Sequence, residues 1–304
     1  MSVRLAVEVG GLRLANPVIA ASGTFGYGVE MAEAGVDLSR LGGLVTKGVS
    51  LLPREGNPPP RICETACGML NAIGLANVGL ERFLAEKLPR LAGVGTAVIV
   101  NLYGESVEEF VALARALAGR EEVAALELNL SCPNVAAGGM AFGVDPEAVE
   151  GITRAVKQVA GRPVWVKLTP NLTDIVAVAR AAEAGGADAV CLINTLLGMA
   201  IDARARRPRL GNVVGGLSGP AIKPVALRMV WQVARAVQVP VVGMGGIAGG
   251  EDAAEFLLAG ARAVQVGTAN FLRPDACLQV VEELRAFCAQ QGVEDVNRLV
   301  GALE

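Results

Sequence analysis

Short apolar runs alternate with longer segments in which apolar residues recur at helical spacing, and this alternation continues through most of the chain. The short runs are bounded by turn residues, as is typical of buried strands. We expect eight strands, at residues 18–21, 43–46, 97–101, 124–129, 164–168, 189–194, 241–245 and 263–267. Helices are expected at residues 79–91, 107–118, 146–160, 173–184, 222–237, 250–259 and 274–290, with Ser106, Asp145 and Thr173 as N-terminal caps.

Strands that alternate with helices predict βαβ units and a parallel sheet, which is the α/β class. Eight such units predict closure into a (β/α)8 TIM barrel, with residues 1–304 as a single domain. A doubly wound open sheet is the alternative, but the early G-x-G-x-x-G fingerprint expected of it is missing.

Two segments, 48–77 and 196–220, are too long for ordinary loops, and both follow predicted strands. We expect them to form long insertions over the carboxyl end of the strands. The second is basic in its middle, and there a solvated face or a partner contact is the favoured interpretation. Its arginines are Arg204, Arg206, Arg207 and Arg209.

Composition narrows the classes of function. A net charge of −3 and a pI near 5.4 argue against nucleic-acid binding. No apolar segment reaches the roughly 18 residues of a membrane span, and the amino end lacks the apolar run of a signal peptide. We therefore expect a cytoplasmic protein with reduced cysteines. The absence of histidine argues against a zinc or iron–sulfur site and removes the commonest general base, leaving Cys, Lys, Asp, Glu or Tyr.

One predicted strand ends in Asn129, and Cys132 follows in a loop that contains Pro133, Gly138 and Gly139. In barrels of this kind, the carboxyl ends of the strands carry the chemistry. Cys132 is therefore a candidate for a reactive thiol. A buried free cysteine beside an ordinary turn is the alternative, because free cysteine is among the most buried residue types.

Polar residues gather at the same end of the other strands. Lys167 interrupts an apolar strand, and a ligand with anionic and polar atoms would justify the cost of burying it. Primary amides donate and accept hydrogen bonds, so Asn71, Asn129 and Asn194, with Thr195, could hold a flat heterocycle. Each of these residues, taken alone, is more often a turn or cap residue.

Glycines follow the last two predicted strands, at Gly245-Gly246 and Gly267-Thr268. Without a Cβ, the backbone can approach a phosphate closely, and the loops after strands 7 and 8 are the usual phosphate site of such barrels. The sequence therefore favours a phosphate-binding site there. Plain turn glycines are the alternative, in a chain with 38 glycines.

An ordered set of motifs, spread over nearly the whole chain, resembles the class 1 dihydroorotate dehydrogenases, in particular the catalytic subunit of the class 1B type. The motifs are Ala21-Ser22-Gly23-Thr24-Phe25-Gly26-Tyr27-Gly28, Thr46-Lys47-Gly48, Asn71-Ala72-Ile73-Gly74-Leu75-Ala76-Asn77, Asn129-Leu130-Ser131-Cys132-Pro133-Asn134, Val166-Lys167-Leu168, Asn194-Thr195-Leu196-Leu197-Gly198-Met199, Gly215-Gly216-Leu217-Ser218-Gly219, Gly245-Gly246-Ile247 and Val266-Gly267-Thr268.

The resemblance implies an FMN-dependent barrel that oxidises (S)-dihydroorotate to orotate in pyrimidine biosynthesis. Cys132 would take a proton from C5 of the substrate, while C6 gives hydride to FMN, and Lys167 would stabilise the reduced flavin. The implied FMN contacts are Ser22, Thr46, Lys47, Asn101, Asn129, Lys167, Ile193, Gly219, Gly245, Gly246, Gly267 and Thr268. The implied substrate contacts are Lys47, Asn71, Ala72, Ile73, Gly74, Leu75, Asn129, Asn194 and Thr195.

The class 1B resemblance also implies a partner, an electron-transfer subunit that carries FAD and [2Fe–2S] and passes electrons to NAD. The expected assembly is a homodimer of catalytic chains within a heterotetramer, with one FMN per catalytic chain. Alternatives are a type 1A enzyme that uses fumarate, a phosphosugar lyase in which Lys167 forms a Schiff base, and a flavin- or phosphate-binding protein without catalysis. A cysteine rather than a serine base, and no amino-terminal anchor, argue against class 2.

Overall fold

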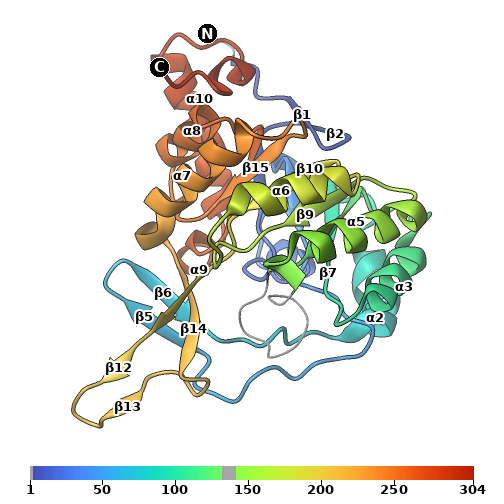
Figure 1. The fold of residues 1–304 in the computed structure, drawn as a ribbon. Coiled ribbons are helices and arrows are strands. Elements are labelled where there is room, and N and C mark those ends of the chain that lie inside the picture. Colours follow the sequence, from blue (N-terminus) through green and yellow to red (C-terminus); the bar gives the residue numbers. More distant parts are fainter. Residues whose placement is uncertain (1–2, 132–141) are drawn as a thin grey trace.

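Eight parallel strands close into a barrel in the computed structural model, which describes residues 3–131 and 142–304 (Figure 1). In order around the barrel they are β3 (Val18–Ala20), β4 (Gly43–Val45), β7 (Ala97–Leu102), β8 (Ala125–Asn129), β9 (Val164–Lys167), β10 (Ala189–Leu192), β15 (Val241–Met244) and β16 (Ala263–Val266). The last strand pairs with the first, Val264 opposite Val18. This closure confirms the predicted (β/α)8 barrel, excludes the open sheet, and places all eight strands where the sequence predicts them.

The barrel strands are buried on both faces, because side chains fill the interior and helices cover the outside. Nearly every residue of the eight strands is buried, including the polar side chains of Asn101, Glu127, Lys167 and Gln265. Strands of parallel sheets therefore read as continuous apolar runs rather than alternating ones. These four polar side chains, and that of Asn129 at the end of β8, face the barrel interior or its mouth and need partners there.

The helices that cover the barrel follow the predicted ranges closely. They are α2 (Gly79–Arg82), α3 (Val107–Leu117), α5 (Pro146–Ala160), α6 (Ile175–Ala184), α7 (Lys223–Ala234), α8 (Gly250–Leu258) and α10 (Ala276–Gln290). Shorter helical pieces are α1 (Val29–Glu33), α9 (Ala269–Leu272), and the segments Leu38–Arg40, Pro220–Ile222 and Val296–Leu299.

Two helix predictions need correction. The segment 79–91 is not one regular α-helix: after α2 it continues as a π-helix, Phe83–Lys87, and a 3-10 turn, Leu88–Leu91. Pro89 lacks an N–H for the α-helical ladder, which accounts for the change near that end. Thr173 is not the cap of α6, because the Asp174 side chain accepts the N–H bonds of Val176 and Ala177. Ser106 and Asp145 do cap their helices.

The two long segments meet each other in a four-stranded antiparallel sheet. Its order is β11 (Leu196–Met199), β14 (Val214–Ser218), β6 (Gly68–Asn71) and β5 (Ile62–Thr65), with Leu217 opposite Leu70. A ribbon of β12 (Ile201–Asp202) and β13 (Arg207–Pro208) projects from it, and its four arginines are exposed, as a solvated face requires. The sheet lies at the opposite end of the molecule from the chain termini (Figure 1).

The other end of the barrel carries a hairpin of β1 (Val7–Val9) and β2 (Leu12–Leu14). The Trp165 indole, which is fully buried, donates a hydrogen bond of 2.9 Å to the carbonyl oxygen of Gly10 in this hairpin. The hairpin thus packs against the barrel through Trp165, at the end away from the insertion sheet. Among the described helices, none combines the length and the apolar character needed to cross a membrane.

Candidate active site

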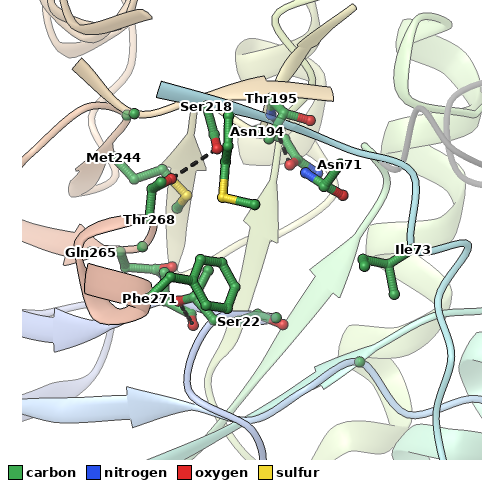
Figure 2. Close-up of a pocket in the computed structure, with 18 of the residues that line it drawn as sticks. Ser22, Asn71, Ile73, Asn194, Thr195, Ser218, Met244, Gln265, Thr268 and Phe271 are labelled. Carbon is green, nitrogen blue, oxygen red and sulfur yellow. Dashed lines mark hydrogen bonds between the residues drawn. The ribbon is translucent and has the colours of Figure 1, made fainter. Parts of the chain in front are cut away.

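A cavity of about 200 Å³ lies between the carboxyl ends of the barrel strands and the insertion sheet (Figure 2). The barrel contributes residues at or just after the ends of seven strands, and the sheet contributes Ile62, Met69, Asn71 and Ser218. Among the predicted site residues, those that line the cavity are Ser22, Lys47, Asn71, Ile73, Gly74, Leu75, Asn129, Lys167, Ile193, Asn194, Thr195, Gly219, Gly245, Gly246, Gly267 and Thr268.

Four predicted site residues are not among those that line the cavity. Thr46 and Asn101 are fully buried behind it, where the Thr46 hydroxyl accepts the backbone N–H of Asn101 at 3.3 Å. Ala72 packs in a small apolar cluster with Leu70 and Leu210. Cys132, the predicted base, lies outside the described residues.

Lys167 ends β9 with its side chain in the cavity wall and is only 5% exposed. Among the described residues, it has no ion pair and no hydrogen-bond partner. An ammonium group buried without a counter-charge is costly. The cavity is therefore electrostatically prepared for a ligand that brings negative charge or acceptor atoms to Lys167.

The glycines after β15 shape one wall of the cavity. Gly245 and Gly246 have positive φ angles of 126° and 80°. A Cβ on Gly245 would lie 2.8 Å from Ala226 Cβ, and one on Gly246 would lie 2.9 Å from the carbonyl oxygen of Gly219. Both positions therefore exclude a side chain, and the bare backbone forms the cavity wall as a phosphate site requires.

Thr268 lies beside this wall, after β16. Its hydroxyl donates a hydrogen bond of 2.8 Å to the Ser218 hydroxyl, which joins the barrel to the insertion sheet (Figure 2). Gly267 precedes it, and a Cβ there would make only ordinary contacts of 3.7 Å. Glycine at 267 is thus not required by packing within the chain, in contrast with Gly245 and Gly246.

A hydrogen-bonded triad orders the amides at the ends of β8 and β10. The Ser131 hydroxyl donates to Asn129 Oδ1 at 2.9 Å and accepts from Asn194 Nδ2 at 2.9 Å. Asn194 Oδ1 in turn accepts the backbone N–H of Thr195 at 2.8 Å. Because Oδ1 of Asn129 is used, its Nδ2 is the atom left to donate to a ligand. Sequence reasoning did not single out Ser131 for this role.

A second polar cluster lies inside the barrel, and of its members only Asn101 was predicted as a site residue. Glu127 is fully buried on β8, and its two oxygens accept hydrogen bonds of 2.7 Å from Asn101 Nδ2 and Gln265 Nε2. Gln265 also lines the cavity. Glu127 and Gln265 were missed, although a charged residue inside the apolar run Leu126–Leu128 is the same signal that selected Lys167.

Burial makes two of the described thiols poor candidates for a catalytic base. Burial, and then the charge of Glu127, raises the pKa of the Cys191 thiol well above its ordinary value. Burial likewise raises the pKa of Cys277 to about 12. Neither thiol can act as a base near neutral pH.

Lys47 lines the cavity, and burial, which outweighs the attraction of Glu30, lowers its pKa from the ordinary value. Its ammonium form is thus less stable in the free protein than in water, and a ligand carboxylate would restore it. Within residues 3–131 and 142–304, no group of three acidic, cysteine or histidine side chains could hold a metal ion.

The family model of dihydroorotate dehydrogenase matches residues 4–288. This chain belongs to the dihydroorotate dehydrogenase family. The resemblance of the sequence motifs to this family is thus confirmed, and the lyase and the non-catalytic binding protein lose their support.

Relatives named "Dihydroorotate dehydrogenase B (NAD(+)), catalytic subunit" match nearly all of this chain. The protein from Solidesulfovibrio magneticus is 59% identical over 304 residues, which cover 100% of this chain and 99% of the relative. That from Geobacter sulfurreducens is 57% identical over 300 residues, covering 99% and 98%. A crystal structure of the Eimeria tenella enzyme in complex with ferulenol superposes with a TM-score of 0.82 at 23% identity, covering 98% of this chain and 88% of the other.

Proposed function

We propose that this chain is the catalytic subunit of an NAD-linked, class 1B dihydroorotate dehydrogenase, which oxidises (S)-dihydroorotate to orotate in pyrimidine biosynthesis. One observation carries the proposal: residues from all nine family motifs converge on a single cavity at the carboxyl end of the barrel. The full-length relatives that carry this name support the class B type over the fumarate-dependent type 1A.

The residues of the cavity fit FMN. The Lys167 ammonium, which has no partner among the described residues, suits a ring that gains negative charge on reduction, and the side-chain-free wall at Gly245 and Gly246 suits a phosphate. Gln265 Oε1, a buried acceptor without a described partner, suits a ring N–H. When bound, FMN supplies the two-electron acceptor for the oxidation. Lys167 would stabilise the negative charge that the ring then carries.

The same cavity offers the groups that a dihydroorotate molecule needs. Lys47 supplies a cation for the carboxylate, and its lowered pKa is relieved when that charge arrives. Asn71, Asn129 and Asn194 offer amides to the carbonyl and N–H groups of the pyrimidine ring. Together these residues would fix the ring so that one face meets the flavin and the other meets the base.

Cys132 is the proposed base and would take the proton from C5 of the substrate. The proposal rests on the motif, in which Cys132 follows Ser131, and Ser131 contacts both Asn129 and Asn194 at the cavity. The raised pKa values of Cys191 and Cys277 leave neither as an alternative thiol. A thiol with an ordinary pKa near 8.5 can accept a proton at neutral pH when held against its substrate.

Electron transfer to NAD would need a second subunit that carries FAD and [2Fe–2S]. No metal-binding cluster of side chains is found in the part of the chain that the structure describes, and the sequence offers no cysteine quartet of the ferredoxin type. We propose a homodimer of these chains within a heterotetramer. We also propose that residues 1–304 act as one domain and work in the cytoplasm.

The test is the anaerobic absorption spectrum of the purified chain before and after addition of dihydroorotate. A yellow protein with one FMN per chain, bleached by dihydroorotate, is the expected result. A colourless protein that borohydride traps as a lysine adduct with a carbonyl substrate would refute the proposal. NAD reduction should need the electron-transfer subunit, so NAD reduction by the chain alone would refute the class 1B assignment.

A further inference from the structure

Glu127 is a fully buried carboxylate of the barrel interior, and two amides and the Cys191 thiol lie beside it. It is 0% exposed, as are both partners that donate to it at 2.7 Å, Asn101 on β7 and Gln265 on β16. Asn101 lies directly opposite Glu127 on the neighbouring strand, whereas Gln265 reaches it from the far wall. Three strands of the barrel are thus joined by one carboxylate.

The carboxylate determines which way both amides point. An ionised carboxylate only accepts hydrogen bonds, so each amide must turn its NH₂ group toward Glu127. The carbonyl oxygens, Asn101 Oδ1 and Gln265 Oε1, are thereby turned away. Both oxygens are buried, and neither has a hydrogen-bond partner among the described residues. A buried acceptor without a partner is rare in folded proteins, and its presence points to a ligand.

Gln265 is the member of this cluster that reaches the cavity, where Figure 2 draws it among the lining side chains. Its oxygen is an acceptor, so the matching ligand group is a donor. The ring system of oxidised FMN has one N–H, at N3 of its pyrimidine portion. A donor and an acceptor of this kind complement each other only if the amide cannot flip, which Glu127 ensures.

We propose that Gln265 accepts the N3–H of bound FMN, and that Glu127 is a positioning residue that holds Gln265 in the accepting orientation. The inference rests on the proposed function, because it requires that the cavity hold FMN. It assigns a role to two side chains that the family motifs quoted above do not include. It also explains why an apolar barrel strand contains a glutamate.

The experiment compares the affinities of the FMN-free protein for FMN and for 3-methyl-FMN, by quenching of flavin fluorescence. The wild type should bind FMN about tenfold or more tightly than the methylated flavin, because one buried hydrogen bond is lost. Gln265→Met keeps the length of the side chain and removes the acceptor. This variant should bind FMN about tenfold more weakly and should bind the two flavins within about threefold of each other.

Glu127→Gln tests the positioning role separately. A glutamine at 127 can donate from the atom that faces Gln265, so the Gln265 amide can turn its carbonyl oxygen toward residue 127 and its NH₂ toward the flavin. The preference for FMN over 3-methyl-FMN should fall, with a smaller loss of affinity than in Gln265→Met. Thr153→Val is the matched control, because it also removes a fully buried polar group, in α5, away from the cavity. It should leave both affinities unchanged.

The outcomes separate this inference from the proposed function. Equal binding of FMN and 3-methyl-FMN by the wild type would overturn the inference alone, and this comparison does not depend on any variant folding. An unchanged preference in Gln265→Met would overturn it as well. If the wild type bound neither flavin, the proposed function would fail together with the inference.

Discussion

Lys167→Met should stabilise the FMN-free protein and weaken its affinity for FMN. Methionine keeps the unbranched apolar stem of lysine and removes only the ammonium. Lys167 is only 5% exposed, and its ammonium has no carboxylate partner among the described residues. If the Lys167 charge serves ligand binding, its removal should raise the stability of the FMN-free protein and lower the affinity for FMN. If the charge serves folding, its removal should lower the stability.

The magnitude follows from burial. Removing an unpaired, buried polar charge should raise the free energy of unfolding by about 1–2 kcal/mol. For a chain of this size, that corresponds to an increase in Tm of roughly 1.5–3 °C. A hydrogen bond to a charged group contributes about 1.5–3 kcal/mol, so the Kd for FMN should rise by roughly 10- to 100-fold.

Thermal unfolding of the FMN-free protein and flavin fluorescence quenching measure the two effects. Lys157→Met is the matched control, because Lys157 pairs with Asp188 on the barrel exterior. Its loss should lower stability slightly or not at all and leave the Kd for FMN unchanged. A Lys167→Met protein that is less stable but binds FMN normally would refute the reasoning and make Lys167 a structural residue.

Three other changes test the rest of the site. Cys132→Ser should keep FMN while strongly slowing flavin reduction by dihydroorotate at neutral pH; unchanged reduction, measured by stopped flow, would remove Cys132 from the mechanism. The affinity for orotate should be full below the lowered pKa of Lys47 and should fall as the pH rises through that pKa, because only the ammonium form attracts the carboxylate. A Kd for orotate that stays constant up to the ordinary pKa of lysine would contradict this role. Gly246→Ala should lower FMN affinity and thermal stability, because its Cβ would lie 2.9 Å from the Gly219 carbonyl oxygen. Gly267→Ala, whose Cβ would make contacts of 3.7 Å, should fold normally by circular dichroism. Equal thermal stability of the two variants would contradict this difference.

The barrel could be predicted from the sequence because its signals are local. Each barrel strand is a short apolar run between turn residues, and each helix repeats at its own period, so neither needs knowledge of distant residues. Ser106 and Asp145 were identified in the same way, from the residues beside them. The prediction of Thr173 as the cap of α6 was wrong by one position, because the carboxylate of the next residue, Asp174, accepts two backbone N–H groups of the helix.

The insertion sheet could not be predicted, because its pairing is not local. Leu217 faces Leu70 across 147 positions of the chain, and both segments contain irregular stretches. In β14, Gly215 and Gly216 interrupt the alternation that would indicate a strand, and both lie close to other side chains or backbone. Length alone indicated that these segments were insertions, and it contained no information about their partners.

A charged residue inside an apolar strand was recognised as a sign of the site at Lys167 and overlooked at Glu127. Lys167 and Glu127 are both charged residues inside apolar barrel strands, but only Lys167 was predicted from the sequence to lie in the site. What distinguishes them is the partner, which only the fold supplies. Glu127 binds amides that lie 26 and 138 positions away, so its charge is satisfied within the chain, whereas Lys167 has no described partner and awaits one from outside. A buried charge in a sequence therefore indicates a site, and the geometry of its neighbours decides whether that charge meets the ligand directly or orients the side chain that does.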